Sequence, residues 1–371
     1  MFLVPKSKLD KKLKEKVNMI MSRKEEHIDI CLNNNVAFEQ KTLFECIKIL
    51  NNPIPEIDFE DIDTSVSFLG HHFSAPIMVG AMTGGAERAK LINKNIALAI
   101  EQLDLGMVVG SQRAALYHKV LEDTYTIARK MAPNAFIGSN IGGAQISAGF
   151  SINDVNRLIE MLDADAHYVH LNPSQELVQP EGEPKYRNVL KGIRNIVDNV
   201  DIPVVIKEVG AGIDGGSAKK LENMGVKSIE LAGAGGTSYT AVEYYRARTM
   251  GMEDKERLGK ILWNWGIPTA ASLYLVKDSV KIPIISSGGM RTGIDVAKAL
   301  IMGASMTALA LPILRPAIES DLAVKKRLEQ LIYELKAVMF LTGSKNISEL
   351  KNAKYIITGE LKDWLGIEKI R

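Results

Sequence analysis

From Pro76 onward, short apolar runs alternate with longer stretches whose apolar residues recur at helical spacing, and this alternation repeats eight times. A short apolar run bounded by turn residues is typical of a buried strand, and the amphipathic stretches are typical of helices packed on a sheet. Repeated strand–helix units give parallel strands joined by right-handed crossovers. We therefore predict an α/β fold in which the units close into a (β/α)8 TIM barrel of about 250 residues.

The predicted strands are short, and glycine or polar residues follow nearly every one. The strands are Ile77–Met82, Met107–Gly110, Ala135–Asn140, Ala166–Leu171, Val204–Lys207, Ser228–Ala232, Pro283–Ser286 and Met306–Ala310. The predicted helices between them include Asn93–Leu103, Val155–Leu162, Val189–Val200, Ser217–Met224 and Ile294–Met302. An open doubly wound sheet is the alternative, but such a sheet concentrates its polar groups at one switch point.

We expect the chain to consist of a basic N-terminal extension, residues 1–21, and a single barrel domain, residues 22–371. Ser22 followed by Glu25 matches a capping box, so we expect a helix to begin there. The chain up to about residue 75 is otherwise expected to be irregular, with one short strand near Val66–Leu69.

Two further segments depart from the strand–helix pattern. The gap between the sixth and seventh strands holds Tyr239–Met252 and Glu253–Lys260 and predicts an insertion, for which a lid and a subunit contact are the two roles left open. After the eighth strand, Asp321–Leu341 predicts a long amphipathic helix. Two short helical pieces, separated by Gly359, are expected to follow it.

The composition excludes several classes of protein. A net charge of +2 gives no field that favours nucleic acid or a membrane surface as the main partner. Two cysteines, Cys31 and Cys46, form no disulfide framework in a chain of 371 residues. The basic start is not followed by an apolar signal sequence, and the longest apolar run, Ala299–Leu314, is interrupted by Gly303 and Pro312. We therefore expect a cytoplasmic protein.

Polar residues gather at the carboxyl ends of the predicted strands, above all in Tyr168–Glu176. If its first half is a strand, Tyr168, His170 and Asn172 share one face. In a barrel all carboxyl ends meet at one rim, where active sites lie. The other seven ends carry Met82-Thr83-Gly84-Gly85, Ser111-Gln112-Arg113, Asn140, Lys207-Glu208, Gly233–Ser238, Ser286–Arg291 and Ala310-Leu311-Pro312.

Glycine pairs after the sixth and seventh strands predict a phosphate site. Without a Cβ, their backbone N–H groups approach an anion closely, and a helix start near Thr292 adds partial positive charge. The polar residues at successive strand ends suit a flat, extended cofactor whose phosphate lies over the seventh and eighth strands. Lys207 would stand inside the barrel, where a lysine needs an anionic partner or a depressed pKa, and the N1–C2=O edge of a reduced flavin is such a partner. A Schiff-base lysine, as in aldolases, is the competing interpretation.

A second anion site is predicted from cationic groups that one phosphate does not require. These groups are Arg23, Lys24, His27, Arg113 and His170. Asn172 and Glu176 offer hard oxygen ligands suited to Mg²⁺, which commonly bridges to substrate phosphates. A diphosphate substrate would use all of them.

Together, the motifs R-K-x-x-H, M-T-G-G, G-S-Q-R, H-L-N-P-x-Q-E, Q-P-E-G-E-P, V-I-K-E-x-G, G-G-T-S, P-T-A-A-S, S-G-G-x-R and A-L-P resemble the FMN-dependent type 2 isopentenyl-diphosphate Delta-isomerases. The resemblance covers roughly residues 22 to 345. It implies interconversion of isopentenyl and dimethylallyl diphosphate in isoprenoid biosynthesis, with FMN, Mg²⁺ and a reductant such as NADPH. It also implies a homotetramer or homo-octamer.

The resemblance assigns roles to individual residues. Those that would bind FMN are Met82, Thr83, Gly84, Ser111, Asn140, Lys207, Thr237, Gly288, Gly289, Arg291, Ala310 and Leu311. Those that would bind the substrate are Arg23, Lys24, His27, Arg113, His170, Asn172 and Gln175. Glu176 would hold Mg²⁺ with Asn172 nearby, and the candidate catalytic residues are Gln175, Lys207 and His170.

Three other functions remain open from the sequence. The first is an FMN barrel that performs net redox chemistry, such as a 2-hydroxy-acid oxidase or dehydrogenase. The second is a flavin-free barrel isomerase or aldolase that uses Lys207. The third is a barrel without catalytic activity that serves as an assembly scaffold.

Overall fold

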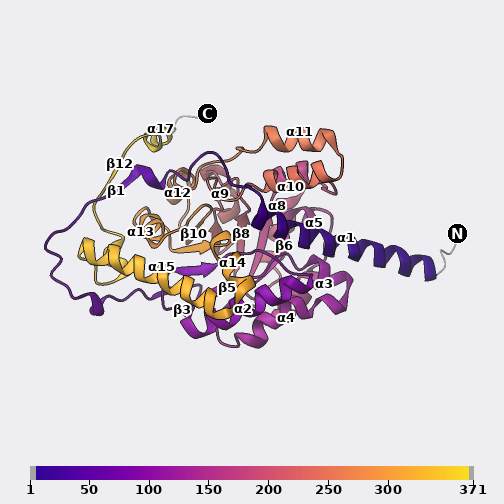
Figure 1. Ribbon diagram of the computed structural model, residues 1–371, viewed down its shortest axis with the longest axis horizontal. Helices are drawn as coiled ribbons and strands as arrows, with labels where there is room; N and C mark the ends of the chain where they lie inside the picture. Colours follow the sequence, from indigo (N-terminus) through magenta and orange to yellow (C-terminus); the bar gives the residue numbers. More distant parts are fainter. Residues whose placement is uncertain (1–5, 367–371) are drawn as a thin grey trace.

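A computed structural model of the chain describes the backbone of residues 6–366 and the side chains of residues 18, 19 and 21–366. Eight parallel strands form a closed barrel in the order β10, β11, β4, β5, β6, β7, β8, β9, as Figure 1 shows. The predicted barrel is therefore confirmed. The strands are β4 (Ile77–Val79), β5 (Gly106–Val108), β6 (Phe136–Gly142), β7 (Ala166–Leu171), β8 (Val204–Glu208), β9 (Ser228–Glu230), β10 (Ile284–Ser287) and β11 (Met306–Leu309).

Helices between successive strands surround the barrel, because each crossover must return the chain to the start of the next parallel strand. The five predicted helices are confirmed, with ends shifted by up to six residues. The surrounding helices are α2 (Glu87–Leu103), α4 (Asp123–Met131), α6 (Ile152–Leu162), α8 (Val189–Val197), α9 (Gly215–Asn223), α12 (Thr269–Lys277), α13 (Gly293–Ile301) and α15 (Asp321–Thr342). Shorter helices at the rim are α3 (Arg113–Tyr117), α5 (Gly143–Ser147), α7 (Pro173–Val178) and α14 (Leu311–Glu319).

A hairpin closes the amino-terminal end of the barrel. The predicted short strand is β2 (Val66–Phe68), which pairs with β3 (His71–Phe73) in antiparallel register. Phe68 and Phe73 are buried and pack with interior side chains of the strands, including Phe136 and Tyr168. This end is therefore filled with apolar side chains, and the carboxyl ends of the strands are left for a cavity.

The N-terminal helix α1 runs from Lys6 to Asn33, so the predicted helix start at Ser22 is wrong. Ser22 lies inside the helix, where its hydroxyl donates to Glu26 Oε1 at 2.7 Å instead of capping a backbone N–H. The lysine-rich stretch before it has good helix formers, which let the helix begin earlier. The second half of α1 packs against α2, α3 and α10 (Tyr239–Thr249), while its first turns extend beyond the barrel (Figure 1).

The predicted insertion after the sixth strand is present as α10 and α11 (Glu253–Ile261), which pack against each other and against α7. The tail contains the two expected short helices, α16 (Ile347–Leu350) and α17 (Leu361–Leu365). Between them lies an unpredicted strand, β12 (Tyr355–Ile357), which pairs with β1 (Ile47–Ile49). Short 3-10 helices are η1 (Phe44–Cys46), η2 (Phe59–Asp61) and η3 (Lys119–Leu121).

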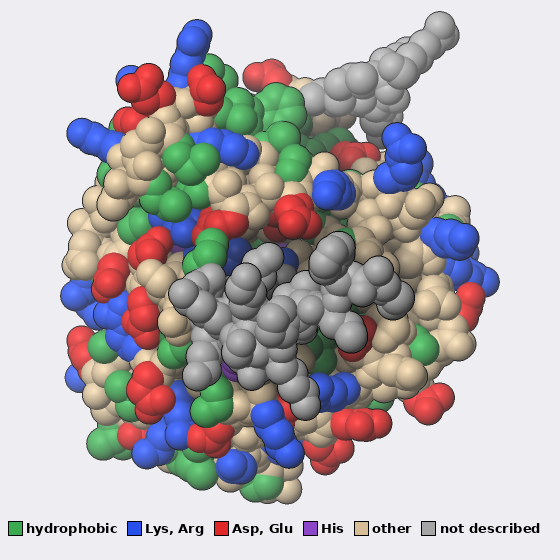
Figure 2. Space-filling model, turned by 90° about the vertical axis from the view of Figure 1, so that its right-hand side faces the viewer, with side chains coloured by type: hydrophobic (Ala, Val, Ile, Leu, Met, Phe, Trp, Pro, Cys, Tyr) green, Lys and Arg blue, Asp and Glu red, His purple; other side chains and the backbone are tan. Residues whose placement is uncertain are grey.

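The distribution of charged side chains on the surface is consistent with the small net charge of +2. On the face drawn in Figure 2, basic and acidic side chains are interspersed, and no large patch of one sign stands out among them. Within residues 6–366, no helix combines the length and the apolar character needed to cross a membrane.

Candidate active site

A cavity opens at the carboxyl ends of the barrel strands, and α1 contributes to its wall. The structure brings nearly all the sequence-predicted site residues together there: Arg23, Lys24, His27, Met82, Thr83, Ser111, Arg113, Asn140, His170, Asn172, Gln175, Glu176, Lys207, Thr237, Gly288, Gly289, Arg291, Ala310 and Leu311. Gly84 is the exception. It packs against Tyr125, whose ring a Cβ at this position would overlap.

Lys207 stands at the inner end of the cavity, as its place on β8 predicts. Its Nζ lies 3.6 Å from Glu230 Oε1 on the neighbouring strand β9, and the two side chains are 6% and 3% exposed. The ammonium group also donates to the backbone carbonyl of Glu208. The anionic partner that a buried lysine requires is therefore supplied within the barrel by Glu230.

His170 lies beside Lys207 in the strand register and is held by Asn140. Its Nδ1 is 2.7 Å from Asn140 Oδ1, an acceptor, so Nδ1 carries the proton and Nε2 is free to accept one. Burial and then the positive charges of Lys207 and Lys24 lower the pKa of His170 to about 3. His170 is consequently a neutral group at physiological pH.

Four basic side chains, which we call the cationic cluster, line the outer part of the cavity: Arg23, Lys24 and His27 from α1 and Arg113 from α3. Burial, followed by Arg23 and Arg113, lowers the pKa of Lys24 to about 7. Burial and Arg113 likewise lower the pKa of Arg23, and its Nε has no hydrogen-bond partner in the described part of the chain. Arg23, Lys24 and Arg113 brought together in this way favour binding of an anion. His27 contributes less charge, because burial lowers its pKa and its Nε2 lies 2.9 Å from Glu243 Oε1.

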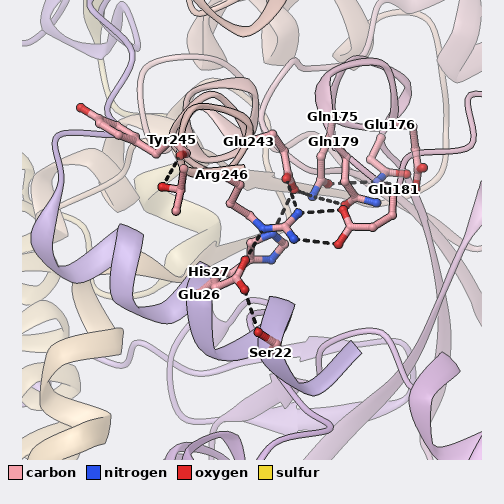
Figure 3. A network of polar contacts seen from close by, with 12 residues as sticks. Ser22, Glu26, His27, Gln175, Glu176, Gln179, Glu181, Glu243, Tyr245 and Arg246 are labelled. Carbon is pink, nitrogen blue, oxygen red and sulfur yellow. Dashed lines mark hydrogen bonds and ion pairs between the residues drawn. The ribbon is translucent and has the colours of Figure 1, made fainter. Parts of the chain in front are cut away.

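A buried polar network connects α1, α7 and α10 behind Gln175 (Figure 3). Gln175 Nε2 donates to Glu243 Oε1 at 2.9 Å, and Arg246 Nη1 donates to Glu243 Oε2 at 2.8 Å. Burial raises the pKa of Glu243, but His27 and Arg246 outweigh it and bring the pKa to about 2. The ionised carboxylate thus fixes which way the amide of Gln175 faces, with its oxygen 3.0 Å from Asn172 Nδ2.

Glu176 is the predicted metal ligand, and its carboxylate is already oriented. Its Oε2 accepts the backbone N–H of Glu183 at 2.8 Å, and its Oε1 lies 3.4 Å from Asn172 Nδ2. Asn172 is fixed in turn, because the hydroxyl of Tyr186 donates to its Oδ1 at 2.8 Å. No group of three or more His, Cys, Asp or Glu suited to a metal occurs in the described residues. A metal at Glu176 would therefore rely on water and substrate oxygens, as Mg²⁺ commonly does.

The turn after β10 forms a narrow glycine-lined cradle. Gly288 and Gly289 have φ of +100° and +72°, a region that favours glycine. A Cβ on Gly288 would come within 2.5 Å of the Gly233 backbone nitrogen. Helix α13 begins just beyond, where Thr292 and Asp295 form a capping box. The cradle and the helix start together suit a phosphate group.

The remaining lining suits the flat ring system of a flavin. Thr83 has a buried hydroxyl without a partner in the described structure, and it lines the same cavity as Met82 and Leu311. An unpartnered buried hydroxyl is expected to be satisfied by a bound group or by water. Apolar walls with a few convergent polar atoms are what small-molecule sites require.

Comparison with known proteins identifies the family. The model of the FMN-dependent dehydrogenase family matches residues 175–357. The isopentenyl-diphosphate delta-isomerase of Methanothermobacter thermautotrophicus is 46% identical over 347 residues, covering 94% of this chain and 96% of the relative. That of Methanococcus maripaludis is 43% identical over 352 residues, covering 94% and 98%. The chain belongs to the isopentenyl-diphosphate delta-isomerase family.

Solved structures of distant sequence share the fold of this isomerase-family chain. A flavocytochrome b2 variant has a TM-score of 0.62 at 19% identity, over 93% of this chain and 85% of that one. A mandelate oxidase variant with an FMN adduct has a TM-score of 0.60 at 16% identity, over 86% and 90%. At these identities the likeness concerns the barrel alone.

Sequence reasoning missed several residues that organise the site: Glu230, Glu243, Arg246 and Glu181. A signal for Glu230 existed, because a charged residue in the apolar strand Ser228–Ala232 points to the interior of the barrel. For Glu243 and Arg246 the only local signal was opposite charges at (i, i+3) spacing, which is also common on solvated helix faces.

Proposed function

We propose that this protein interconverts isopentenyl diphosphate and dimethylallyl diphosphate by moving a proton between allylic positions. The observation that carries the proposal is that two separate groups of residues suited to anions line one cavity. The cationic cluster lies at its outer part, and the glycine cradle of Gly288 and Gly289 lies after β10. A cofactor phosphate would occupy one of them, and a substrate diphosphate would account for the other. Family membership at 46% identity supports the same activity.

FMN is the cofactor that the cavity suits. The cradle at Gly288, Gly289 and Arg291 would hold its phosphate, and Thr83, Asn140 and Lys207 would contact its ring system. When bound in its reduced form, FMN supplies an electron-rich ring and an exchangeable proton. NADPH is our proposal for the reductant.

The chain's own residues bind and orient the substrate. The cationic cluster would neutralise the diphosphate, and Glu176 would attach Mg²⁺ to it with Asn172 alongside. Gln175 is a weak acid and is held by Glu243, so we assign it to positioning the alkene or relaying a proton. His170, neutral with a free Nε2, would accept a hydrogen bond. Enclosure by α1 and α10 would keep water from the developing positive charge.

The test is turnover without net redox change. Anaerobic protein reduced with NADPH would be mixed with isopentenyl diphosphate and Mg²⁺, and both the product and the remaining NADPH would be measured. We expect many product molecules for each NADPH consumed. Consumption of NADPH or another oxidant or reductant in proportion to product would instead favour a 2-hydroxy-acid oxidase or dehydrogenase type of reaction.

A flavin-free enzyme and a scaffold without activity would each give a distinct result. A Schiff base at Lys207 would be trapped by borohydride in the presence of substrate, and colourless protein that binds no FMN would favour a scaffold. The homotetramer or homo-octamer stays a prediction, which sedimentation of the purified protein would test.

A further inference from the structure

Glu230 is a buried carboxylate beside Lys207 that the proposed reaction does not use. The two residues are direct partners in the register of β8 and β9, so both side chains point into the barrel. Ser287, at the end of β10, donates its hydroxyl to Glu230 Oε1 at 2.9 Å. Three neighbouring strands thus meet in one small polar cluster under the cavity.

The carboxylate of Glu230 is only partly satisfied. Oε1 faces both Ser287 and Lys207, whereas Oε2 is buried with no partner among the residues that the structure describes. An unpaired buried carboxylate oxygen is costly. Glu230 also lines the cavity. The unfavourable burial of its free oxygen therefore occurs where a ligand would contact Lys207.

No other ionised carboxylate in the described residues competes for Lys207 at ion-pair distance. The carboxylate of Glu208 is occupied by the backbone N–H groups of residues 209–211. His170, the register partner on β7, is neutral because its pKa is about 3. Besides its hydrogen bond to the backbone carbonyl of Glu208, the Lys207 ammonium group therefore has Glu230 as its ion-pair partner among the described residues.

We propose that Glu230 is a positioning residue that holds Lys207 and sets how strongly Lys207 favours reduced over oxidised FMN. The inference rests on the flavin cofactor of the proposed function. Reduced flavin has extra negative charge at its N1–C2=O edge, and a lysine near that edge stabilises it. The Glu230 carboxylate, 3.6 Å from the ammonium group, competes with the reduced flavin for interaction with the positive charge of Lys207. In a site removed from water this competition is strong.

The test compares affinities for the two redox states of FMN. Wild-type protein and Glu230→Gln would each be titrated with oxidised FMN and, under anaerobic conditions, with reduced FMN, with flavin fluorescence or absorbance as the signal. We expect the ratio of reduced to oxidised affinity to rise about tenfold in Glu230→Gln, which for a two-electron couple is an upward shift of about 30 mV. An unchanged ratio would overturn the inference.

A double-mutant cycle shows whether the effect passes through Lys207. The same substitution made in a Lys207→Met background is expected to change the ratio much less. An equal change in that background would mean that Glu230 acts on the flavin directly, and it would overturn the positioning role. Wild-type protein that binds no FMN would refute the proposed function together with this inference, whereas FMN binding with an unaltered ratio refutes the inference alone.

Glu230→Asp provides a second test in case the Glu230→Gln variant does not fold. It keeps the charge and shortens the side chain, so it withdraws the carboxylate from Lys207. We expect a smaller rise of the affinity ratio in the same direction. If Asp left the ratio at the wild-type value while the protein bound oxidised FMN normally, contact with Lys207 would be excluded as the cause.

Discussion

Arg246 Nε lies 2.8 Å from Glu26 Oε2, and this contact joins the insertion helix α10 to α1, the helix that carries most of the cationic cluster. Arg246 also pairs with Glu181 at 2.7 Å and with Glu243 at 2.8 Å. One buried guanidinium thus connects α1, the loop after α7 and the carboxylate that orients Gln175 (Figure 3).

We expect Arg246→Met to destabilise the protein strongly, because it removes the guanidinium that pairs with Glu243, whose side chain is 0% exposed, and leaves that buried carboxylate with His27 and Gln175 as hydrogen-bonding partners. Loss of one partner of a buried ion pair costs about 3–5 kcal/mol. Urea unfolding would measure the change in the free energy of unfolding. Arg88→Met is the matched control, since Arg88 pairs with Glu25 and Asp29 on α1 but is 30% exposed, and it should cost about 1 kcal/mol or less. Equal losses for the two variants would contradict this prediction.

Anion binding should be accompanied by proton uptake at Lys24. Its pKa is lowered to about 7, first by burial and then by Arg23 and Arg113. At pH 8 the free protein therefore holds Lys24 mostly neutral, and a bound diphosphate favours the charged form. Calorimetry with inorganic diphosphate in buffers of different ionisation enthalpy would measure the uptake, with Lys24→Met as the control. Binding without proton uptake in the wild type would refute the prediction.

The lowered pKa of Lys24 also predicts how the stability of the protein changes with pH. Its pKa is about 7 in the folded protein and 10.5 for the ordinary group, so the unfolded chain binds more protons between these values. The free energy of unfolding should then rise with pH across this window. The comparison is between wild type and Lys24→Met from pH 7 to pH 10, where the variant should lack this contribution.

Substitution of Glu176 should change the requirement for Mg²⁺. Glu176→Gln keeps the shape of the side chain but removes the charge, so we expect the Mg²⁺ concentration for half-maximal activity to rise by more than about tenfold. Glu183→Gln is a useful control, because Glu183 donates to Glu176 through its backbone N–H, which the substitution keeps. An unchanged Mg²⁺ requirement in Glu176→Gln would remove this residue from the metal site.

The parts of the structure that follow from local periodicity were predictable, and the parts that depend on distant contacts were not. The strand Ala166–Leu171 was predicted to the residue, because its apolar run ends sharply at Asn172 and Pro173. Residues at strand ends, such as Lys207, follow from barrel geometry. By contrast, β12 exists through pairing with β1, at the other end of the chain.

The false helix start at Ser22 shows the limit of a local motif. A serine followed by a glutamate three residues later also occurs inside helices, and here Ser22 bonds to Glu26 instead. The role of Glu243 was not predicted for a related reason: it comes from contacts with Gln175 and His27, which lie far away in the sequence. A single sequence predicts which residues face the cavity, but it does not predict which residues hold them.

Gly288→Ala should disrupt the cradle after β10, both through left-handed backbone strain and through a clash of the new Cβ. Gly149→Ala, which has the strain without the clash, separates these two causes. Both glycines have positive φ, +100° and +93°, but a Cβ on Gly149 has no atom within 4 Å, whereas one on Gly288 meets the backbone of Gly233. Left-handed strain alone costs an L-residue about 1–2 kcal/mol. We expect Gly149→Ala to lose that much and to keep its FMN. Gly288→Ala should lose more stability and bind FMN at least about tenfold more weakly, the equivalent of about 1.4 kcal/mol. Thermal unfolding and FMN titration would measure both quantities, and normal FMN affinity in Gly288→Ala would place the phosphate elsewhere.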